Sequence, residues 1–372
     1  MRVALELQPC CGKRSGIGVY TYELAKRMRA GDGLEFYGDI FNFLGRNDNA
    51  GSLAGISMPL RECKLFPYGV YRRIWNKVHI PHEALFRGET DLNVFFNYIV
   101  PPHVVGKVMT TVYDLTYLRF PETMDAGNLK RLQDGMKYSI ERSDGIVTIS
   151  EFSKREIMEL LEIPEDRIYV VPCAPSFNGR PADFDGCAAK FGIDRPYILY
   201  IGTIEPRKNL VRLIQAYERL KREQGIPHQL VLAGGKGWAN DEIIHMAEKV
   251  ENVILTGYIS EEEKYALYKN ADVFAFPSIY EGFGIPPLEA MHFGCPVVCA
   301  AAASLPEVVE DAAELVDPMD PVSIAEGLWK VISDPDHAAE LVRRGREQTE
   351  KYTWDTSAVK LTEACRAVLE PR

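Results

Sequence analysis

The chain has 372 residues, of which 46% are hydrophobic and 26% are charged, a composition typical of a soluble globular protein with room for two domains. The formal net charge is −10, and the whole acidic excess lies after residue 178, which argues against a nucleic-acid-binding protein because such proteins usually carry a basic face. We expect neither a transmembrane helix nor a signal peptide, since no sufficiently long apolar run occurs.

Short apolar runs alternate with helical patterns from the N-terminus onward. The predicted strands of the first half are 2–7, 36–41, 92–96, 108–114, 145–150 and 168–172, and those of the second half are 197–202, 229–235, 252–257, 272–277, 296–300 and 312–317. The predicted helices include 19–30, 128–142, 209–223, 261–270, 322–333 and 354–370. Many strands are apolar on both faces, so we predict the α/β class, with parallel sheets covered by helices.

A segment rich in glycine, proline and aspartate, 173–196, interrupts this alternation once. It contains a single short helix pattern, at 184–191, and we interpret it as the linker between two doubly wound domains. Ligands of open parallel sheets bind past the carboxyl ends of the strands. With two such domains, the cleft between them is the expected site.

Eight cysteines are spread along the chain without paired spacing. Cys10 and Cys11 are adjacent and cannot hold a metal in the C-x-x-C manner. We expect reduced cysteines, as in a cytoplasmic protein.

The loop after the first predicted strand, "CCGKRSGIGVYTYEL" (10–24), contains Gly16 and Gly18 before a helix. The dinucleotide fingerprint G-x-G-x-x-G is incomplete here, because Thr21 stands where the third glycine belongs. A glycine turn beside a phosphate or an acceptor and a plain tight turn remain equal alternatives.

The loop "YIGTIEPRKNL" (200–210) follows a strand in the second half and places Arg207 and Lys208 side by side after Gly202. Two cations at the start of a helix are electrostatically unfavourable, so the pattern favours an anionic ligand. A diphosphate fits, because arginine binds it with a fork and lysine with a point charge.

The loop "EGFGIPPLE" (281–289) follows the strand predicted at 272–277. Its two prolines suit a first helical turn, because their missing N–H groups would be unpaired there. Gly282 and Gly284 leave backbone N–H groups accessible at the helix start, where a phosphate or a partly negative oxygen is favoured.

A carboxylate stands at each end of this segment: Glu281 at its start and Glu289 inside the helix. A carboxylate can accept a pair of hydrogen bonds from the hydroxyls of a sugar, which makes a sugar a plausible target. The alternative is an acidic, solvent-facing turn in which Glu289 acts as a capping residue.

Together these loops resemble the pattern of glycosyltransferase family 4 (group 1) within the GT-B fold. The resemblance covers nearly the whole chain and rests on "ISEFSKREI" (149–157), "GTIEPRKN" (202–209), "EGFGIPPLEAM" (281–291) and "SLPEV" (304–308). It implies an acceptor-side Rossmann-like domain at 1–178, joined by a C-terminal helix (355–372) that crosses back to it. The nucleotide-sugar donor-binding domain would occupy 179–354 and face the first across a cleft.

The resemblance implies retaining transfer of a sugar from a nucleotide-sugar donor, with no cofactor and no metal. It implies that Glu281 contacts the transferred sugar, that Glu289 contacts the nucleotide ribose, and that Arg207 and Lys208 stabilise the leaving diphosphate. The residues expected at the donor are Gly16, Gly18, Gly202, Arg207, Lys208, Gly235, Tyr258, Glu281, Gly282, Phe283, Gly284, Ile285 and Glu289. The base pocket is expected at "AGGKGW" (233–238) and "TGYIS" (256–260).

The chain departs from the family at "VYDLTYLRFPE" (112–122), where relatives often have His-Asp and this sequence has Tyr113-Asp114. Asp114 is therefore the candidate for catalytic and acceptor contact, with His103 as the second acceptor candidate. No second carboxylate pair of glycosidase type is evident in the first half, which favours a same-face route in which the leaving phosphate assists.

The context of "GTIEPRKN" and "SLPEV" most resembles that of bacterial surface-polysaccharide mannosyltransferases. The preferred function is therefore transfer of a hexose, mannose from GDP-mannose first, to a glycan or lipid-linked glycan. A UDP-sugar such as UDP-glucose is the second donor, and sugar-nucleotide epimerisation is a second reaction on this architecture. An inactive nucleotide-sugar-binding partner subunit is the non-enzymatic alternative. The segment 68–88 mixes aromatics with Arg72, Arg73 and Lys77, and is either an ordinary packed helix or a peripheral contact with the inner face of the membrane.

Overall fold

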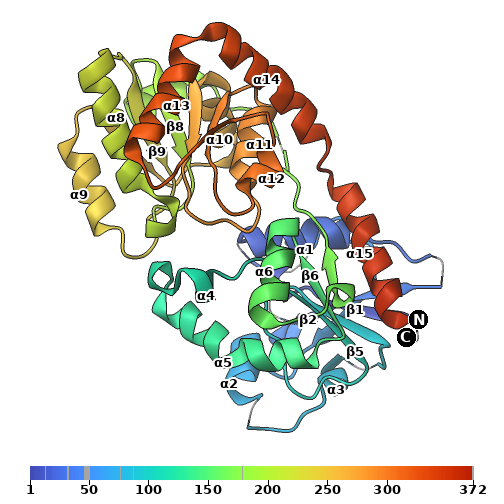
Figure 1. The fold of residues 1–372 in the computed structure, drawn as a ribbon. Helices are drawn as coiled ribbons and strands as arrows, with labels where there is room; N and C mark the ends of the chain where they lie inside the picture. Colours follow the sequence, from blue (N-terminus) through green and yellow to red (C-terminus); the bar gives the residue numbers. More distant parts are fainter. Residues whose placement is uncertain are drawn as a thin grey trace. The chain divides into compact units, whose positions relative to one another are not determined.

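The computed structural model describes residues 1–12, 14–31, 33–45, 51–75, 77–86, 88–177 and 179–370. The chain divides into two compact units (Figure 1). The first consists of Met1–Tyr117, Ala126–Cys173 and Thr353–Arg372, and the second of Leu118–Asp125 and Ala174–Tyr352. The predicted boundaries were 178/179 and 354/355; Asn178 itself lies outside the described residues. Residues 118–125, expected in the first domain, group with the second unit.

The first unit is built on a parallel sheet in the order β3-β2-β1-β4-β5-β6-β7. Its strands are β1 (Arg2–Glu6), β2 (Glu35–Phe41), β3 (Leu60–Cys63), β4 (Leu92–Phe95), β5 (Lys107–Thr111), β6 (Gly145–Thr148) and β7 (Ile168–Val170). Six of these were predicted. The strand β3 was missed because it lies at the sheet edge and only Cys63 of its residues is buried, which leaves no apolar run to recognise.

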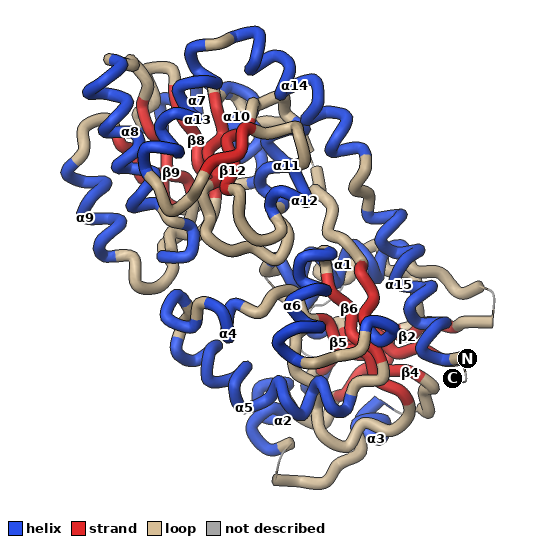
Figure 2. The backbone as a smooth tube through the Cα atoms, in the orientation of Figure 1, coloured by secondary structure: helices blue, strands red, loops and turns tan. Residues whose placement is uncertain are grey.

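Helices cover this sheet (Figure 2). They are α1 (Gly16–Arg27), α2 (Tyr68–Ile74), α3 (His82–Phe86), α5 (Ala126–Arg142), α6 (Glu151–Leu161) and α15 (Trp354–Leu369), with α4 (Thr116–Arg119) where the chain passes into the second unit. The C-terminal helix α15 belongs to the first unit, as predicted. The Trp354 ring lies edge-on to Tyr20 of α1 at 5.8 Å, and Ser357 donates a hydrogen bond of 2.8 Å to the carbonyl of Pro172.

The second unit has a parallel sheet in the order β10-β9-β8-β11-β12-β13. Its strands are β8 (Tyr197–Ile201), β9 (Gln229–Ala233), β10 (Val253–Gly257), β11 (Val273–Phe276), β12 (Val297–Ala300) and β13 (Glu314–Val316). Its helices are α7 (Phe184–Phe191), α8 (Leu210–Gln224), α9 (Asp241–Lys249), α10 (Glu261–Asn270), α11 (Ile285–His292), α12 (Leu305–Val309), α13 (Pro321–Ser333) and α14 (Pro335–Glu350). All six strands were predicted, because β8, β9, β11 and β12 are buried along their whole length and read as apolar runs.

The segment 68–88 forms two short helices rather than one. The ring of Tyr71 is buried and stacks on Phe41 at 4.9 Å, and Trp75 and Ile80 pack against the same cluster. The aromatic side chains of this segment therefore contribute to the core of the first unit. Among the described residues, no helix has the length and apolar character needed to span a membrane.

Candidate active site

The loops after β8 and β11 meet at the centre of the second sheet. These two strands are neighbours, although their loops lie far apart in sequence, and the strand order reverses between them. Such a reversal opens a crevice past the carboxyl ends of the strands, where ligands of open α/β sheets bind. The loop after β8 carries Arg207 and Lys208, and the loop after β11 carries Glu281.

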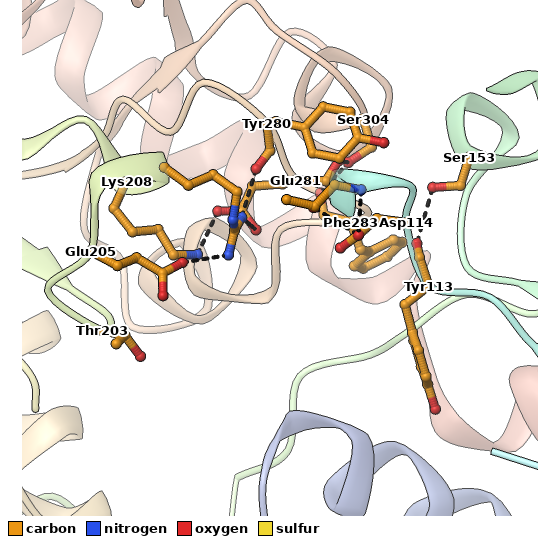
Figure 3. A network of polar contacts seen from close by, with 12 residues as sticks. Tyr113, Asp114, Ser153, Thr203, Glu205, Lys208, Tyr280, Glu281, Phe283 and Ser304 are labelled. Carbon is orange, nitrogen blue, oxygen red and sulfur yellow. Dashed lines mark hydrogen bonds and ion pairs between the residues drawn. The ribbon is translucent and has the colours of Figure 1, made fainter. Parts of the chain in front are cut away.

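The Glu281 carboxylate accepts a hydrogen bond from Lys208 (Figure 3) and forms an ion pair with Arg207. Its Oε1 lies 2.5 Å from Lys208 Nζ, and its Oε2 lies 2.9 Å from Arg207 Nη1. Burial by itself would raise the pKa of Glu281, but the charges of Arg207 and Lys208 lower it to about 2. The carboxylate is therefore ionised and acts as the counter-ion of both cations.

Arg207 is held by further contacts. Its Nη1 donates to the carbonyl of Tyr280 at 2.6 Å, and its Nη2 donates to Glu205 Oε1 at 2.7 Å. Glu205 is almost fully buried, and burial raises its pKa against the opposing charge of Arg207. This guanidinium ties the two loops together, so it has a structural role besides any contact with a ligand.

Asn209 fixes the loop that presents the cations. It adopts a left-handed conformation with φ 61°, and its buried amide donates to the carbonyls of Pro277 at 3.0 Å and Pro318 at 2.6 Å. The backbone N–H of Ile279 donates to the carbonyl of Arg207 at 3.0 Å. The positions of both loops are thus set by tertiary hydrogen bonds.

The loop 281–284 leads into α11, whose first turn contains the two prolines, as predicted. Gly284 has φ 118°, and a Cβ at this position would lie 2.6 Å from Leu305. The fully buried Ser304 hydroxyl lies 2.8 Å from the carbonyls of both Glu281 and Phe283, so it can donate to either. The backbone of this loop is therefore fixed by the segment that begins α12.

Glu289 lies inside α11 and is buried. Its Oε1 is 2.7 Å from Lys264 Nζ, and its Oε2 accepts a hydrogen bond of 3.1 Å from Tyr268. Burial raises the pKa of Glu289, although the charge of Lys264 opposes the shift. The second carboxylate of the loop thus has its own partners on α10 and does not share those of Glu281.

The loops after β8 and β9 approach closely at Gly202 and Gly234. A Cβ on Gly234 would lie 1.9 Å from the carbonyl oxygen of Gly202, so a side chain cannot be accommodated. The next residue, Gly235, accepts a hydrogen bond of 3.0 Å from Ile204 and is exposed. Tyr258, after β10, is 69% exposed. These residues border the same edge of the sheet as the ion pairs of Glu281 with Arg207 and Lys208.

In the first unit, α1 begins at Gly16 rather than at residue 19, so the two predicted donor glycines lie in the first helical turn. The N–H of Gly18 already donates to the Ser15 side chain at 3.4 Å. A Cβ on Gly18 would lie 2.4 Å from the carbonyl oxygen of Pro9, which gives this glycine a packing role. Gly16 is exposed and borders the carboxyl edge of its sheet.

Tyr113 is a structural residue. Its buried hydroxyl donates to the carbonyl of Phe96 at 2.8 Å, and its ring lies 5.3 Å from that of Tyr20. Burial raises its pKa well above the ordinary value. Asp114 follows it at the carboxyl end of β5, and Oδ1 accepts hydrogen bonds from the N–H and hydroxyl of Thr116 at 3.0 and 2.7 Å.

The two acceptor candidates, His103 and Asp114, lie beyond opposite ends of β5. His103 precedes the start of β5, whereas Asp114 follows the end of that strand, and five strand residues span about 16 Å. The ring of His103 lies 4.3 Å from that of His79, and its carbonyl accepts a hydrogen bond from the N–H of His82.

Four residues that organise the site were not predicted: Glu205, Asn209, Lys264 and Ser304. Three lie within "GTIEPRKN" or "SLPEV". Asn209 and Ser304 bond to carbonyls of other loops, whereas Glu205 bonds to Arg207 of its own loop. Among the described residues, no group of three or more His, Cys, Asp and Glu side chains is arranged to hold a metal ion.

Comparison with known proteins relates both the sequence and the fold to characterised ones. The family model "Glycosyl transferases group 1" matches residues 188–348. The chain is 30% identical over 381 residues to the Escherichia coli O-antigen chain mannosyltransferase B, covering 98% of this chain and 99% of that protein.

Two solved structures share the fold at low identity. Anabaena HepE in complex with UDP and glucose superposes with a TM-score of 0.70 at 17% identity, covering 98% of this chain and 99% of that one. A sucrose-phosphate synthase from Thermosynechococcus elongatus gives a TM-score of 0.69 at 18% identity, covering 98% of both chains.

Proposed function

Because the chain belongs to the group 1 glycosyltransferases, we propose that it transfers a mannosyl group from GDP-mannose to a glycan or lipid-linked glycan acceptor, with retention and without a metal. The full-length similarity to a mannosyltransferase supports the choice of sugar. The observation that carries the proposal is the Glu281 carboxylate bound by Arg207 and Lys208 at the strand-order reversal of the second sheet.

The cluster suggests how the donor binds. The Glu281 carboxylate pairs with Lys208 and Arg207, the same cations that we propose bind the donor diphosphate. A bound diphosphate therefore competes with Glu281 for them. Glu281 then offers oxygen atoms to the hydroxyls of the transferred sugar. The N–H groups of Phe283 and Gly284, at the start of α11, add hydrogen-bond donors for the sugar and diphosphate.

In the proposed reaction the bond between the sugar C1 and the phosphate oxygen breaks, and a bond between C1 and the acceptor oxygen forms on the same face. The acceptor proton passes to the leaving phosphate. Lys208 and Arg207 stabilise the negative charge that grows on this phosphate, which is the task a metal ion would otherwise perform. Asp114 is proposed to accept a hydrogen bond from the acceptor, and Glu289 from the ribose.

The proposal places the enzyme in the cytoplasm. All eight cysteines are free thiols in the structure, which suits a reducing compartment.

Thermal unfolding with GDP, UDP, ADP or dTDP, first with EDTA and then with magnesium, tests the donor. We expect stabilisation by GDP in EDTA, because a ligand that binds the folded state raises its melting temperature. A selective shift with UDP would replace GDP-mannose by a UDP-sugar, and a shift that requires magnesium would contradict the metal-free part of the proposal.

Turnover is tested separately by release of GDP from GDP-mannose, with water or an added glycan as acceptor. We expect release and retention of the anomeric configuration. Binding of GDP-mannose with no release under any acceptor condition would favour the inactive partner subunit, in which Tyr113 replaces a catalytic histidine.

A further inference from the structure

A cavity of about 500 Å³ lies wholly within the first unit, between α2, α5 and the loop after β4. Three arginines, Arg72, Arg73 and Arg131, line it together with Trp75 and Tyr138. None of these side chains belongs to the donor-side cluster, which consists of Arg207, Lys208 and Glu281. The cavity is thus basic, with aromatic walls.

The position of the cavity in the sheet is that of a ligand site. The strand order of the first sheet reverses between β1 and β4, and Ile99, from the loop after β4, lines the cavity. The preceding residue, Tyr98, has its ring 5.5 Å from that of Tyr113, which is followed by Asp114. The cavity therefore lies past the carboxyl end of β4, one of the two strands at this reversal, at the edge of the sheet where open α/β sheets bind ligands and where Asp114 also lies.

The arginines lack acidic partners in the part of the chain that the structure describes. No ion pair joins Arg72, Arg73 or Arg131 to a carboxylate there. Asp134, the one carboxylate among the described lining residues, lies 3.2 Å from Lys130. Arg72 and Arg73 are exposed, so their charge faces the cavity mouth or solvent.

Arg131 is the most enclosed of the three. Its Nη2 donates to Asn97 at 3.3 Å; burial lowers its pKa, and the charge of Arg72 lowers it further. The carboxyl of Glu6, whose charge acts on Arg72, has its pKa raised to about 8 by burial and by Asp39. Near neutral pH Glu6 is therefore mostly protonated and does not neutralise the cluster. An anion in the cavity would relieve the repulsion between the two guanidiniums.

We propose that this cavity binds a phosphate or diphosphate group carried by the acceptor. The inference rests on the proposed glycosyltransferase function, since it names the class of molecule that receives the sugar. Guanidinium forks match the oxygens of phosphate, which explains why arginine rather than lysine supplies the charge. Trp75, Tyr138 and Ile99 provide apolar surface for the sugar or carrier next to the phosphate.

The test is a titration of the full-length protein with inorganic pyrophosphate, in which binding is measured by calorimetry or ³¹P NMR. All variants are made in a Lys208→Ala background, which removes one of the two cations beside Glu281 and so weakens that competing site. We expect Arg131→Gln and Arg72→Gln each to raise Kd about tenfold or more, as loss of a charge-assisted hydrogen bond does.

Lys137→Gln is the matched control. Lys137 lies on α5 like Arg131, is 87% exposed, and is 3.9 Å from Glu141. Its loss removes one positive charge from the same helix without changing the cavity, so pyrophosphate affinity should stay within about twofold. Arg72→Gln guards against a folding defect of the Arg131 variant, because Arg72 is exposed. Equal Kd values in all three variants would overturn the proposal.

Vesicles separate the two sources of the phosphate. If pyrophosphate displaces the protein from phosphatidylcholine vesicles that contain phosphatidylglycerol, the phosphate belongs to a lipid. If pyrophosphate binds and the vesicles do not, it belongs to a soluble phosphorylated glycan. Binding to neither would overturn the proposal. Release of GDP from GDP-mannose into water by the wild-type protein reports the glycosyltransferase function alone, so the two proposals can fail independently.

Discussion

Lys208 and Glu281 lie 73 positions apart in the chain, and yet Lys208 Nζ is 2.5 Å from a carboxylate oxygen of Glu281. The pair joins the loops after two neighbouring strands, β8 and β11. A diphosphate placed on Lys208 must therefore compete with a carboxylate already there. In our proposal this competition couples donor binding to the release of Glu281 toward the sugar.

Replacement of Glu281 should reduce turnover more than donor affinity. We expect Glu281→Gln to lower the rate of GDP-mannose turnover by at least about 100-fold, because the lost contacts lie at the reacting sugar. The Kd for GDP should change less than about tenfold, since the loss of a competing carboxylate offsets lost binding. Glu310→Gln, which removes an exposed carboxylate 2.7 Å from Lys351 in the same unit, is the control. Equal losses of binding and turnover would contradict this role.

The two cations should differ in their effects. Lys208→Met should raise the Kd for GDP by about tenfold or more with little loss of stability. Arg207→Ala should weaken GDP binding strongly and also lower the melting temperature, because Arg207 additionally binds Glu205 and the carbonyl of Tyr280. Calorimetry and thermal unfolding measure both effects. The exposed Lys269 of α10, changed to Met, should leave both unchanged; unaltered GDP affinity in the Lys208 variant would remove the diphosphate assignment.

Ser304 should be important for the geometry of the loop 281–284. Ser304→Ala removes the only side-chain hydroxyl that bonds the carbonyls of Glu281 and Phe283, among the hydrogen bonds of the described residues. We expect a loss of about 1–3 kcal/mol in the free energy of unfolding and a lower turnover. Urea unfolding measures the first effect. Ser333→Ala, where an exposed hydroxyl bonds the carbonyl of Trp329, should cost much less, and equal costs would argue against a special role for Ser304.

Glu289 should report on the ribose. Wild-type protein should bind GDP more tightly than a deoxyribose analogue of GDP, because a carboxylate accepts hydrogen bonds from the ribose hydroxyls. In Glu289→Gln this preference should shrink by about tenfold. Glu261→Gln is the matched control, since Glu261 is the second partner of Lys264, at 3.1 Å, and its side chain is 60% exposed. A preference that survives in the Glu289 variant would place the ribose elsewhere.

Glu6 should make stability depend on pH between about 4.5 and 8. Its pKa is about 8 in the folded protein against an ordinary value of 4.5, so the folded state binds its proton more tightly than the unfolded state. The free energy of unfolding should therefore fall by about 1.4 kcal/mol per pH unit between these two values. Glu6→Gln, which carries no ionisable group, should be more stable than wild type near pH 8 and lose this advantage toward pH 5. A stability difference independent of pH would contradict the shifted pKa.

Much of the fold could be predicted because its signals are local. Twelve of the strands follow from apolar runs, and the helix whose first turn contains Pro286 and Pro287 follows from the missing N–H groups of proline. The edge strand β3 could not be predicted, because only Cys63 of its four residues is buried and no apolar run marks it. The segment 68–88 was expected as one helix, but packing of Tyr71 against Phe41 favours two short ones.

The sequence by itself determined the fold class, the order of strands and helices, and which loops would carry charge, since each depends on residues close together in the chain. Only the tertiary structure decided which charges meet. Lys208 reaches Glu281 because β8 pairs with β11, and His103 and Asp114 are separated because β5 runs between them. Three arginines from two helices converge on one cavity for the same reason. Pairing of distant strands and packing of helices set these distances, and neither can be read from local sequence patterns.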